Sequence, residues 1–309
     1  MPTPIRRLDG IIPILSMPFR EDDEIDLESL VAQAEWLAVT GVDGVGFGFG
    51  SEIYRLTDAE RDLAIATVVR VLAGRLPIVA AASANSTRAT LLRSEAARDA
   101  GASVLMITPP AFASPTPDDL VTHYAAIADR VGLPIIVQDA PSMTNVTMTD
   151  DLLVRLAQEI DLVVAVKIEA LPPAPKVGAV VAKIGDAASV LGGAGGIDFA
   201  HELGRGAHGT IPGAATPELF VAVYRHARAG NLPAARALFN RYLPLLSLSA
   251  RTMDTFLFTQ REILRRRGIL PSTHMRHPSE HLDPFFPTEL EQMLCDLDLA
   301  NLDRTWNPS

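Results

Sequence analysis

The sequence predicts an α/β fold, a (β/α)8 TIM barrel followed by a C-terminal helical extension. Short apolar segments recur eight times in the first 211 residues, and segments with helical periodicity separate them. The apolar segments lack the alternation of half-exposed strands, which favours strands buried on both faces of a parallel sheet. Eight strand–helix units in about 210 residues suit a closed barrel. The predicted strands are residues 11–17, 44–49, 78–82, 104–108, 135–139, 163–168, 189–192 and 206–211.

Helix-start motifs support the helical segments between these strands. Thr57 and Glu60 have the spacing of a capping box, and Thr149 precedes an apolar periodic run. A doubly wound open sheet is the alternative fold. It would usually carry a glycine-rich phosphate loop after the first strand, and residues 14–19 do not form one. The predicted helices include residues 27–39, 58–72, 87–100, 118–130 and 150–158.

The barrel is expected to span residues 1–230, and the helical extension residues 231–309, packed on the barrel as one structural unit. Helical periodicity continues from residue 217 to about residue 268. The following segment is rich in proline and histidine and predicts irregular structure, with a last helix at residues 288–299.

Composition excludes several classes of protein. Apolar residues make up 48% and charged residues 21%, which provides a core and argues against disorder. The net charge of −10 disfavours binding to nucleic acid. Cys295 is the single cysteine, which fits a reducing compartment. The sequence shows neither a secretion signal nor an 18-residue apolar run, so we expect a cytoplasmic protein with no membrane span. The seven histidines show no metal-site spacing, so neither a metal nor a cofactor is expected.

Lys167 is the strongest candidate for a catalytic residue. The chain has 24 arginines and three lysines, and Lys167 ends the predicted sixth strand, where barrel active sites lie. An ammonium among apolar neighbours is costly, which favours the free amine that attacks a ketone to form a Schiff base. An ion pair with Glu169 or Glu52 is an equally supported alternative from this pattern. Lys176 and Lys183 lie seven residues apart on a predicted helix, where a solvated face is expected.

Glu169 is a candidate base. Period-two alternation places it on the same side of the strand as Lys167, where it could remove a substrate proton. The alternative is a loop carboxylate without a catalytic role.

Glycine-rich loops after two strands could bind a carboxylate through backbone N–H groups. Gly50 and Ser51 follow the second strand, and Gly193 and Gly195 follow the seventh. Ordinary turns explain the glycines about equally well. Gln138 ends the fifth strand with Asp139 and is expected to face the pocket or to cap the next loop. Its amide can orient a ligand but cannot exchange protons at a useful rate.

An ordered set of motifs covers nearly the whole chain. The set comprises Pro18 and Phe19, residues 48–52, Leu56, Thr57 and Glu60, residues 84–87, Thr108 and Pro109, residues 133–141, Val166 and Lys167, and residues 206–211. In this set the chain resembles the dihydrodipicolinate synthase / N-acetylneuraminate lyase family. The resemblance implies a barrel with a C-terminal helical extension, a homotetramer, and a pyruvate or longer 2-keto acid substrate bound to Lys167. It also implies that the loop with Gly50 and Ser51 holds the substrate carboxylate.

The chain departs from this family at its proton-transfer residues. Gln138 replaces the usual tyrosine on the fifth strand, residues 109–112 lack the second tyrosine, and Phe49 and Gly50 replace a threonine pair. The segment from Gln138 to Pro141 and the loop from Gly192 resemble the branch that dehydrates 2-keto-3-deoxy sugar acids. The resemblance therefore implies dehydration of L-2-keto-3-deoxyarabonate to 2-oxoglutarate semialdehyde. An aldolase that forms pyruvate and an aldehyde, a non-catalytic keto-acid-binding paralogue, and an unrelated barrel with a structural lysine are the alternatives.

Overall fold

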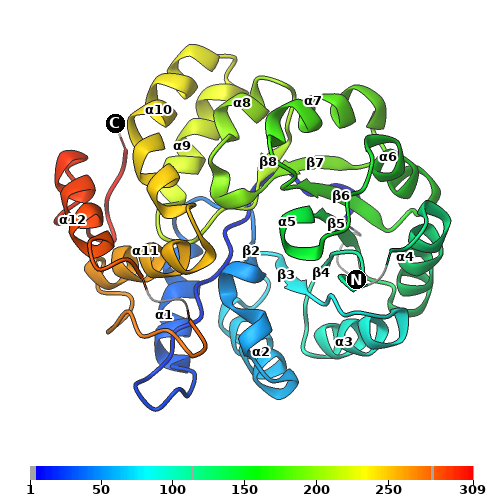
Figure 1. The fold of residues 1–309 in the computed structure, drawn as a ribbon, viewed down its shortest axis with the longest axis horizontal. Helices are drawn as coiled ribbons and strands as arrows, with labels where there is room; N and C mark the ends of the chain where they lie inside the picture. Colours follow the sequence, from blue (N-terminus) through cyan, green and yellow to red (C-terminus); the bar gives the residue numbers. More distant parts are fainter. Residues whose placement is uncertain (1–4, 113, 280–281, 309) are drawn as a thin grey trace.

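Eight parallel strands form one curled sheet, which confirms the expected number and direction of strands (Figure 1). The computed structural model describes residues 5–112, 114–279 and 282–308. Neighbouring strands follow the order β1-β8-β7-β6-β5-β4-β3-β2. The strands are β1 (Gly10–Ile11), β2 (Val45–Phe47), β3 (Ile78–Ala81), β4 (Val104–Ile107), β5 (Ile135–Asp139), β6 (Val163–Ile168), β7 (Ser189–Gly192) and β8 (Gly209–Thr210).

The first and last strands are shorter than predicted. Pro13 and Pro212 follow them closely, and a proline has no N–H to donate to a ladder. Beyond β1, Ile14 makes single parallel bridges to Gly46 in β2, the strand at the other end of the sheet, and to Gly213 after β8. These two bridges connect the sheet into a ring.

Apolar side chains fill the inside of this ring. Successive side chains of a strand point to opposite faces, so one set points inward and the other packs against the helices. The inward cluster consists of Leu8, Ile12, Ile14, Val79, Val104, Met106, Ile136, Val164, Ala165, Leu191 and Ile211. Lys167 pairs in register with Leu191, a member of this cluster, so the lysine side chain also lies on the inner face.

Helices surround the strands, largely where periodicity predicts them (Figure 1). Thr57 and Glu60 form the expected capping box, and the Thr149 side chain accepts a hydrogen bond from the backbone N–H of Leu152. The helices of this part are α1 (Leu27–Leu37), α2 (Asp58–Leu72), α3 (Thr87–Asp99), α4 (Pro117–Val131), α5 (Pro141–Thr144), α6 (Asp150–Glu159), α7 (Pro173–Ile184), α8 (Phe199–Leu203) and α9 (Pro217–Arg228). Short 3-10 turns are η1 (Phe49–Ser51), η2 (Ile53–Arg55) and η3 (Ala194–Gly196).

Three further helices group at one side of the barrel (Figure 1). They are α10 (Leu232–Ser249), α11 (Met253–Arg266) and α12 (Phe286–Asp296). The last helix begins two residues before its predicted start and ends three residues before its predicted end, ahead of Asp298, whose φ of 60° is left-handed. The division at residue 230 stays a prediction. Among the described helices, none combines the length and apolar character needed to cross a membrane.

A buried ion network connects α11 to the start of the barrel. Glu52, with no exposed surface, forms ion pairs with Arg55 and Arg261. Arg55 also contacts Asp254 at 2.9 Å, and Arg261 donates to the Met17 carbonyl at 2.8 Å. The alternative pairing of Lys167 with Glu52 is therefore wrong, because two arginines occupy that carboxylate.

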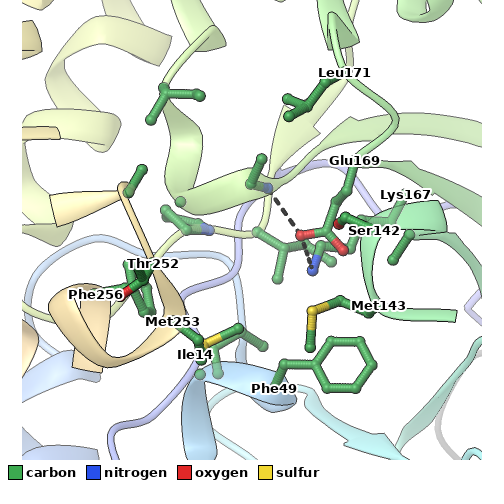
Figure 2. A pocket seen from close by; sticks show the side chains of 18 residues that line it. Ile14, Phe49, Ser142, Met143, Lys167, Glu169, Leu171, Thr252, Met253 and Phe256 are labelled. Atoms are coloured by element: carbon green, nitrogen blue, oxygen red, sulfur yellow. Dashed lines mark hydrogen bonds and ion pairs between the residues drawn. The ribbon is translucent and has the colours of Figure 1, made fainter. Parts of the chain in front are cut away.

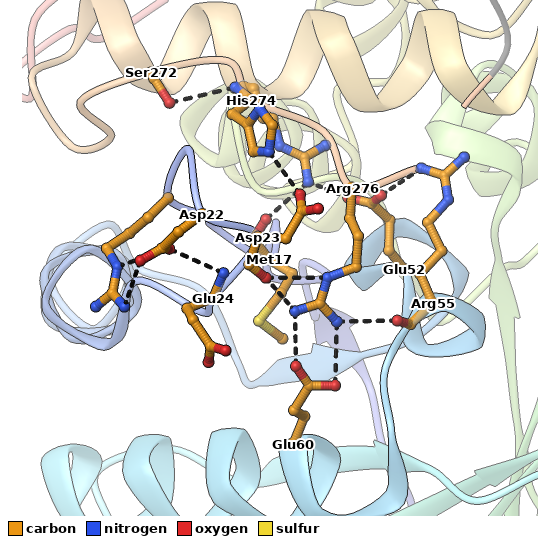
Figure 3. Close-up of polar contacts among 12 residues, drawn as sticks. Met17, Asp22, Asp23, Glu24, Glu52, Arg55, Glu60, Ser272, His274 and Arg276 are labelled. Atoms are coloured by element: carbon orange, nitrogen blue, oxygen red, sulfur yellow. Dashed lines mark hydrogen bonds and ion pairs between the residues drawn. The ribbon is translucent and has the colours of Figure 1, made fainter. Parts of the chain in front are cut away.

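The irregular segment after α11 crosses the N-terminal part of the chain (Figure 3). Arg276 donates to both Glu60 oxygens, at 2.7 and 3.1 Å, and its guanidinium lies 4.4 Å from the centre of the Phe19 ring. His274 contacts Asp23 at 2.8 Å. The hydrogen bonds from Arg276, with those of Thr57, lower the pKa of Glu60 to about 2 although burial opposes the shift.

Replacing Arg276 by methionine should destabilise the protein by about 1–2 kcal/mol at pH 7, because the bidentate pair with Glu60 is lost. The lowered pKa of Glu60 means that its stabilisation is complete above its ordinary value of 4.5 and is lost as the pH falls toward 2. Unfolding measured over this range should therefore show the difference between variant and wild type shrinking. Arg98→Met, which removes an exposed pair with Asp99, is the control. A constant difference across the pH range would contradict this assignment.

Candidate active site

A cavity of about 220 Å³ lies at the carboxyl ends of the strands (Figure 2). Its walls come from loops after several strands and from α11 of the extension. Most of the wall is apolar, formed by Ile14, Phe49, Met143, Leu171, Met253 and Phe256. The ionisable groups among its lining residues are Lys167 and Glu169. The cavity therefore offers one amine and one carboxylate in largely apolar surroundings.

Lys167 occupies the position that the sequence predicts, within β6 and next to its end. Its side chain is about 5% exposed, and its Nζ lies 3.1 Å from Oε1 of Glu169 (Figure 2). The amine thus lines the cavity and also forms the ion pair with Glu169 that the sequence offered as an alternative to catalysis. The two descriptions are compatible, because an ion pair can hold the amine where a ketone would enter.

Three groups hold the Glu169 carboxylate in place. The Gln138 amide donates to Oε2 at 2.6 Å, the Ala194 N–H donates to Oε1 at 2.8 Å, and the Lys167 ammonium contacts Oε1. Burial alone would raise the pKa of Glu169, but these three partners together hold it below its usual range. The group is therefore an anion at neutral pH. Gln138 does not line the cavity but acts on it through Glu169.

The predicted glycine-rich loops approach the cavity to different extents. Gly50 and Gly195 line it. Ser51 has no exposed surface, and its hydroxyl donates to the Leu15 carbonyl at 2.5 Å, so the structure does not bring it into the cavity wall. Gly193 lies against Glu169, whose side chain occupies the space that a Cβ at Gly193 would need. The loop after β7 thus packs against Glu169 through Gly193 and Ala194.

Several lining residues were not found from the sequence. Ser142 and Thr252 bring hydroxyl groups to the cavity, and Phe256 lies beside Gly50 and Gly195. A Cβ at either glycine would come within 3.1 or 3.4 Å of the Phe256 ring. Ser142 follows the end of β5 closely and could have been found by that position. Thr252 and Phe256 lie far along the chain in the extension, and no local motif marks them.

The two other lysines differ in how far their side chains are exposed to solvent. Lys183 has a side chain 48% exposed beside Asp151, as expected for a solvated helix face. Lys176 does not, because its Nζ lies 2.6 Å from the buried Asp139 carboxylate and 2.5 Å from the Met148 carbonyl. The expectation of a solvated face is therefore wrong for Lys176: α7 packs this part of its surface against the end of β5.

Potential metal ligands are dispersed. In the portion of the chain that the structure describes, no three His, Cys, Asp or Glu side chains lie close enough to hold a metal ion.

Comparison with known proteins gives the site its context. Residues 7–296 match the Dihydrodipicolinate synthetase family. The chain belongs to this family. Its members are lyases of the aldolase and dehydratase class.

Similar family members include enzymes with different names. The chain is 30% identical over 295 residues to L-2-keto-3-deoxyarabonate dehydratase of Azospirillum brasilense, covering 94% of each protein. It is 32% identical over 294 residues to 4-hydroxy-tetrahydrodipicolinate synthase of Thermomicrobium roseum, again covering 94% of each. These identities resolve the family but do not separate the two reactions.

Solved structures of family members share the fold. Dihydrodipicolinate synthase from Aquifex aeolicus superposes with a TM-score of 0.88 at 26% identity, covering 95% of this chain and 99% of that one. The enzyme from Acinetobacter baumannii, solved with pyruvate, gives 0.87 at 28% identity, covering 94% and 99%. The (β/α)8 architecture predicted from the sequence is the fold of this family.

A second acidic residue, Glu202, is buried beside Gly192 at the end of β7. Glu202 in α8 has no exposed surface, and among the described residues neither carboxyl oxygen has a hydrogen-bond partner. Its side chain occupies the space beside Gly192, where a Cβ would overlap it. Burial, with smaller effects of Asp198 and Glu169, raises the pKa of Glu202 to about 8. This carboxyl is therefore neutral at pH 7.

Glu202→Gln should stabilise the protein at pH 8 by about 4 kcal/mol, because each unit of the pKa shift corresponds to about 1.4 kcal/mol. The pKa of Glu202 is raised from 4.5 to about 8, so the unfolded chain releases the proton first and wild-type stability falls as the pH rises through this window. At pH 4.5 both forms should have nearly equal unfolding free energies. Denaturant unfolding at several pH values measures this, with the exposed Glu28→Gln as control. Parallel profiles of E202Q and wild type would show that the buried carboxyl is ionised.

Proposed function

We propose that this chain is a Schiff-base-dependent lyase that dehydrates L-2-keto-3-deoxyarabonate to 2-oxoglutarate semialdehyde. The observation that carries the proposal is the Lys167 amine 3.1 Å from a carboxylate held by Gln138, in a small and mostly apolar cavity. The similarity to a dehydratase of this substrate supports the choice within the family.

The chemistry follows from the two ionisable groups. Lys167, once deprotonated, adds to the C2 ketone, and loss of water gives an iminium that acidifies the C3 protons. Glu169 removes a C3 proton, and the resulting enamine expels the C4 hydroxyl, which takes that proton from Glu169 and leaves as water. A proton then moves from C5 to C3, which restores the iminium at C2 and leaves an enol across C4 and C5. Protonation at C4 with loss of the enol proton gives the aldehyde, and water hydrolyses the iminium, which releases the product and regenerates the amine. The net change is loss of one water.

The site supports dehydration better than aldol cleavage. Aldol cleavage needs a base at the C4 hydroxyl, a proton that dehydration never removes. Gln138 occupies the position of the family's tyrosine, and an amide cannot exchange that proton at a useful rate. Among the described residues that line the cavity, Glu169 is the one carboxylate. An aldolase forming pyruvate and an aldehyde is the second candidate, because it would use the same lysine.

The remaining cavity groups would bind the rest of the substrate. We assign the substrate carboxylate to the side of the cavity bounded by Gly50 and Gly195, where the backbone is accessible. The hydroxyls of Ser142 and Thr252 would contact the sugar hydroxyls. Ser51 would serve indirectly, because its hydrogen bond to Leu15 fixes the loop that carries Gly50. The homotetramer remains a prediction from the family resemblance.

Incubation with L-2-keto-3-deoxyarabonate should give a five-carbon product one water lighter than the substrate, detected by mass spectrometry. Borohydride added with pyruvate should form a reduced adduct on Lys167, and Lys167→Arg should lose both the adduct and the activity. Pyruvate and a two-carbon aldehyde as products would show an aldolase. If the wild-type protein binds the keto acid but forms no adduct, it is a non-catalytic binding protein.

Glu169→Gln should lower kcat by about 100- to 10,000-fold with a small change in KM, because an amide cannot accept the C3 proton. Steady-state kinetics at saturating substrate measures the effect. The adduct on Lys167 with pyruvate and borohydride is the control, since its formation in E169Q shows that the amine still reacts. A kcat near the wild-type value would place the base elsewhere.

A further inference from the structure

We propose that Asp139 and Lys176 are positioning residues that fix the loop carrying Glu169 in its place beside Lys167. The inference deepens the proposed function, since it rests on Glu169 acting at that site. It concerns a pair of charged residues that lie outside the cavity wall.

Asp139 holds both ends of this loop. Residues 169–172 connect the end of β6 at Ile168 to the start of α7 at Pro173. The Asp139 carbonyl accepts a hydrogen bond from the Glu169 N–H at 2.9 Å. The Asp139 carboxylate contacts Lys176, in the first turn of α7, at 2.6 Å. One residue at the end of β5 therefore sets where the loop leaves the sheet and where it enters the helix.

The side chain of Asp139 points away from the cavity. Gln138 pairs in register with Lys167, and Asp139 pairs with Ile168, so the two neighbours face opposite sides of the sheet. Gln138 thus contacts Glu169 on the inner side while Asp139 contacts α7 on the outer side. The end of β5 therefore positions Glu169 through contacts on both faces of the sheet.

Lys176 also binds the segment between α5 and α6. Its Nζ donates to the Met148 carbonyl at 2.5 Å, and the Met148 N–H lies 3.5 Å from the other Asp139 oxygen. Helix α5 precedes this segment and brings Ser142 and Met143 to the cavity. Lys176 therefore connects α7 to two segments that shape the site.

Charge explains why the pair must be complete. Asp139 has no exposed surface, and burial raises the pKa of its carboxyl while the Lys176 ammonium opposes that shift. Without the ammonium, the buried carboxyl either stays ionised without a counter-ion, which is strongly unfavourable, or takes up a proton. In both cases the 2.6 Å contact that holds α7 to the end of β5 is lost. The loop would then move to admit water or another partner. A displacement near 1 Å at Glu169 is enough to disrupt its bonds to Gln138 and Ala194 and can cost about 100-fold in rate.

The test compares the reactivity of Lys167 in K176M, in the double variant D139N/K176M, and in the control K183M. Lys183 lies on the same helix and pairs with an exposed carboxylate, so its loss should leave the site unchanged. Acetic anhydride labels amines, and the chain has only three lysines, so peptide mass spectrometry can follow each one. The labelling needs no substrate. E169Q serves as the reference for an amine without its carboxylate.

We expect E169Q to raise the acetylation rate of Lys167 at pH 7 by about 10-fold, because the ion pair no longer protects the amine. K176M should show a rise of similar size, and so should the double variant, because it also lacks the contact between Asp139 and α7 although no unpaired charge remains. K183M should stay within about 2-fold of wild type. With the sugar acid, K176M should lower kcat by about 10- to 100-fold and change KM little. The double variant removes both charges, so it tests the inference if K176M alone does not fold.

Wild-type labelling of Lys167 in both K176M and the double variant would overturn the proposal. A lower melting temperature with an unchanged labelling rate would do the same, because it shows a role in stability alone. The outcome is separate from that of the proposed function. Failure of wild-type Lys167 to form an adduct with pyruvate would disprove the Schiff-base mechanism. The labelling rates would still show whether Glu169 remains paired with Lys167.

Discussion

The ion pair between Lys167 and Glu169 is the constraint around which the barrel end is built. An ammonium and a carboxylate, 5% and 16% exposed, can stay there only if both are paired and hydrogen-bonded. Gln138 and Ala194 meet this requirement for Glu169, since each donates a hydrogen bond to its carboxylate. The same arrangement leaves an amine facing a cavity, which is what imine chemistry requires.

Glycines provide the space for these groups, because they carry no side chain of their own. Gly193 makes room for Glu169, and Gly192 makes room for the buried acid Glu202. Gly50 and Gly195 leave room for the ring of Phe256. The glycines after β7 therefore serve packing as well as turn geometry, which is why turn chemistry and ligand binding could not be separated from the sequence.

The extension completes the cavity, and a buried ion network fixes it to the barrel. Glu52 binds Arg55 from the β2–α2 connection and Arg261 from α11, and α11 also carries Phe256. Breaking one partner of such a network is far more costly than its net contribution, because a buried charge remains. The position of the Phe256 wall thus depends on charges outside the cavity.

The sequence by itself determined the strands, most of the helices, the family and the placement of Lys167, Glu169 and Gln138 at strand ends, because hydrophobic periodicity and strand alternation are local properties. Only the tertiary structure decided that Lys176 is partly buried and paired with Asp139, that Ser51 turns away from the cavity, and that Phe256 lines it. These outcomes depend on which helix packs on which strand and on where each buried charge finds its partner. Such contacts join residues far apart in the chain, so no local pattern encodes them.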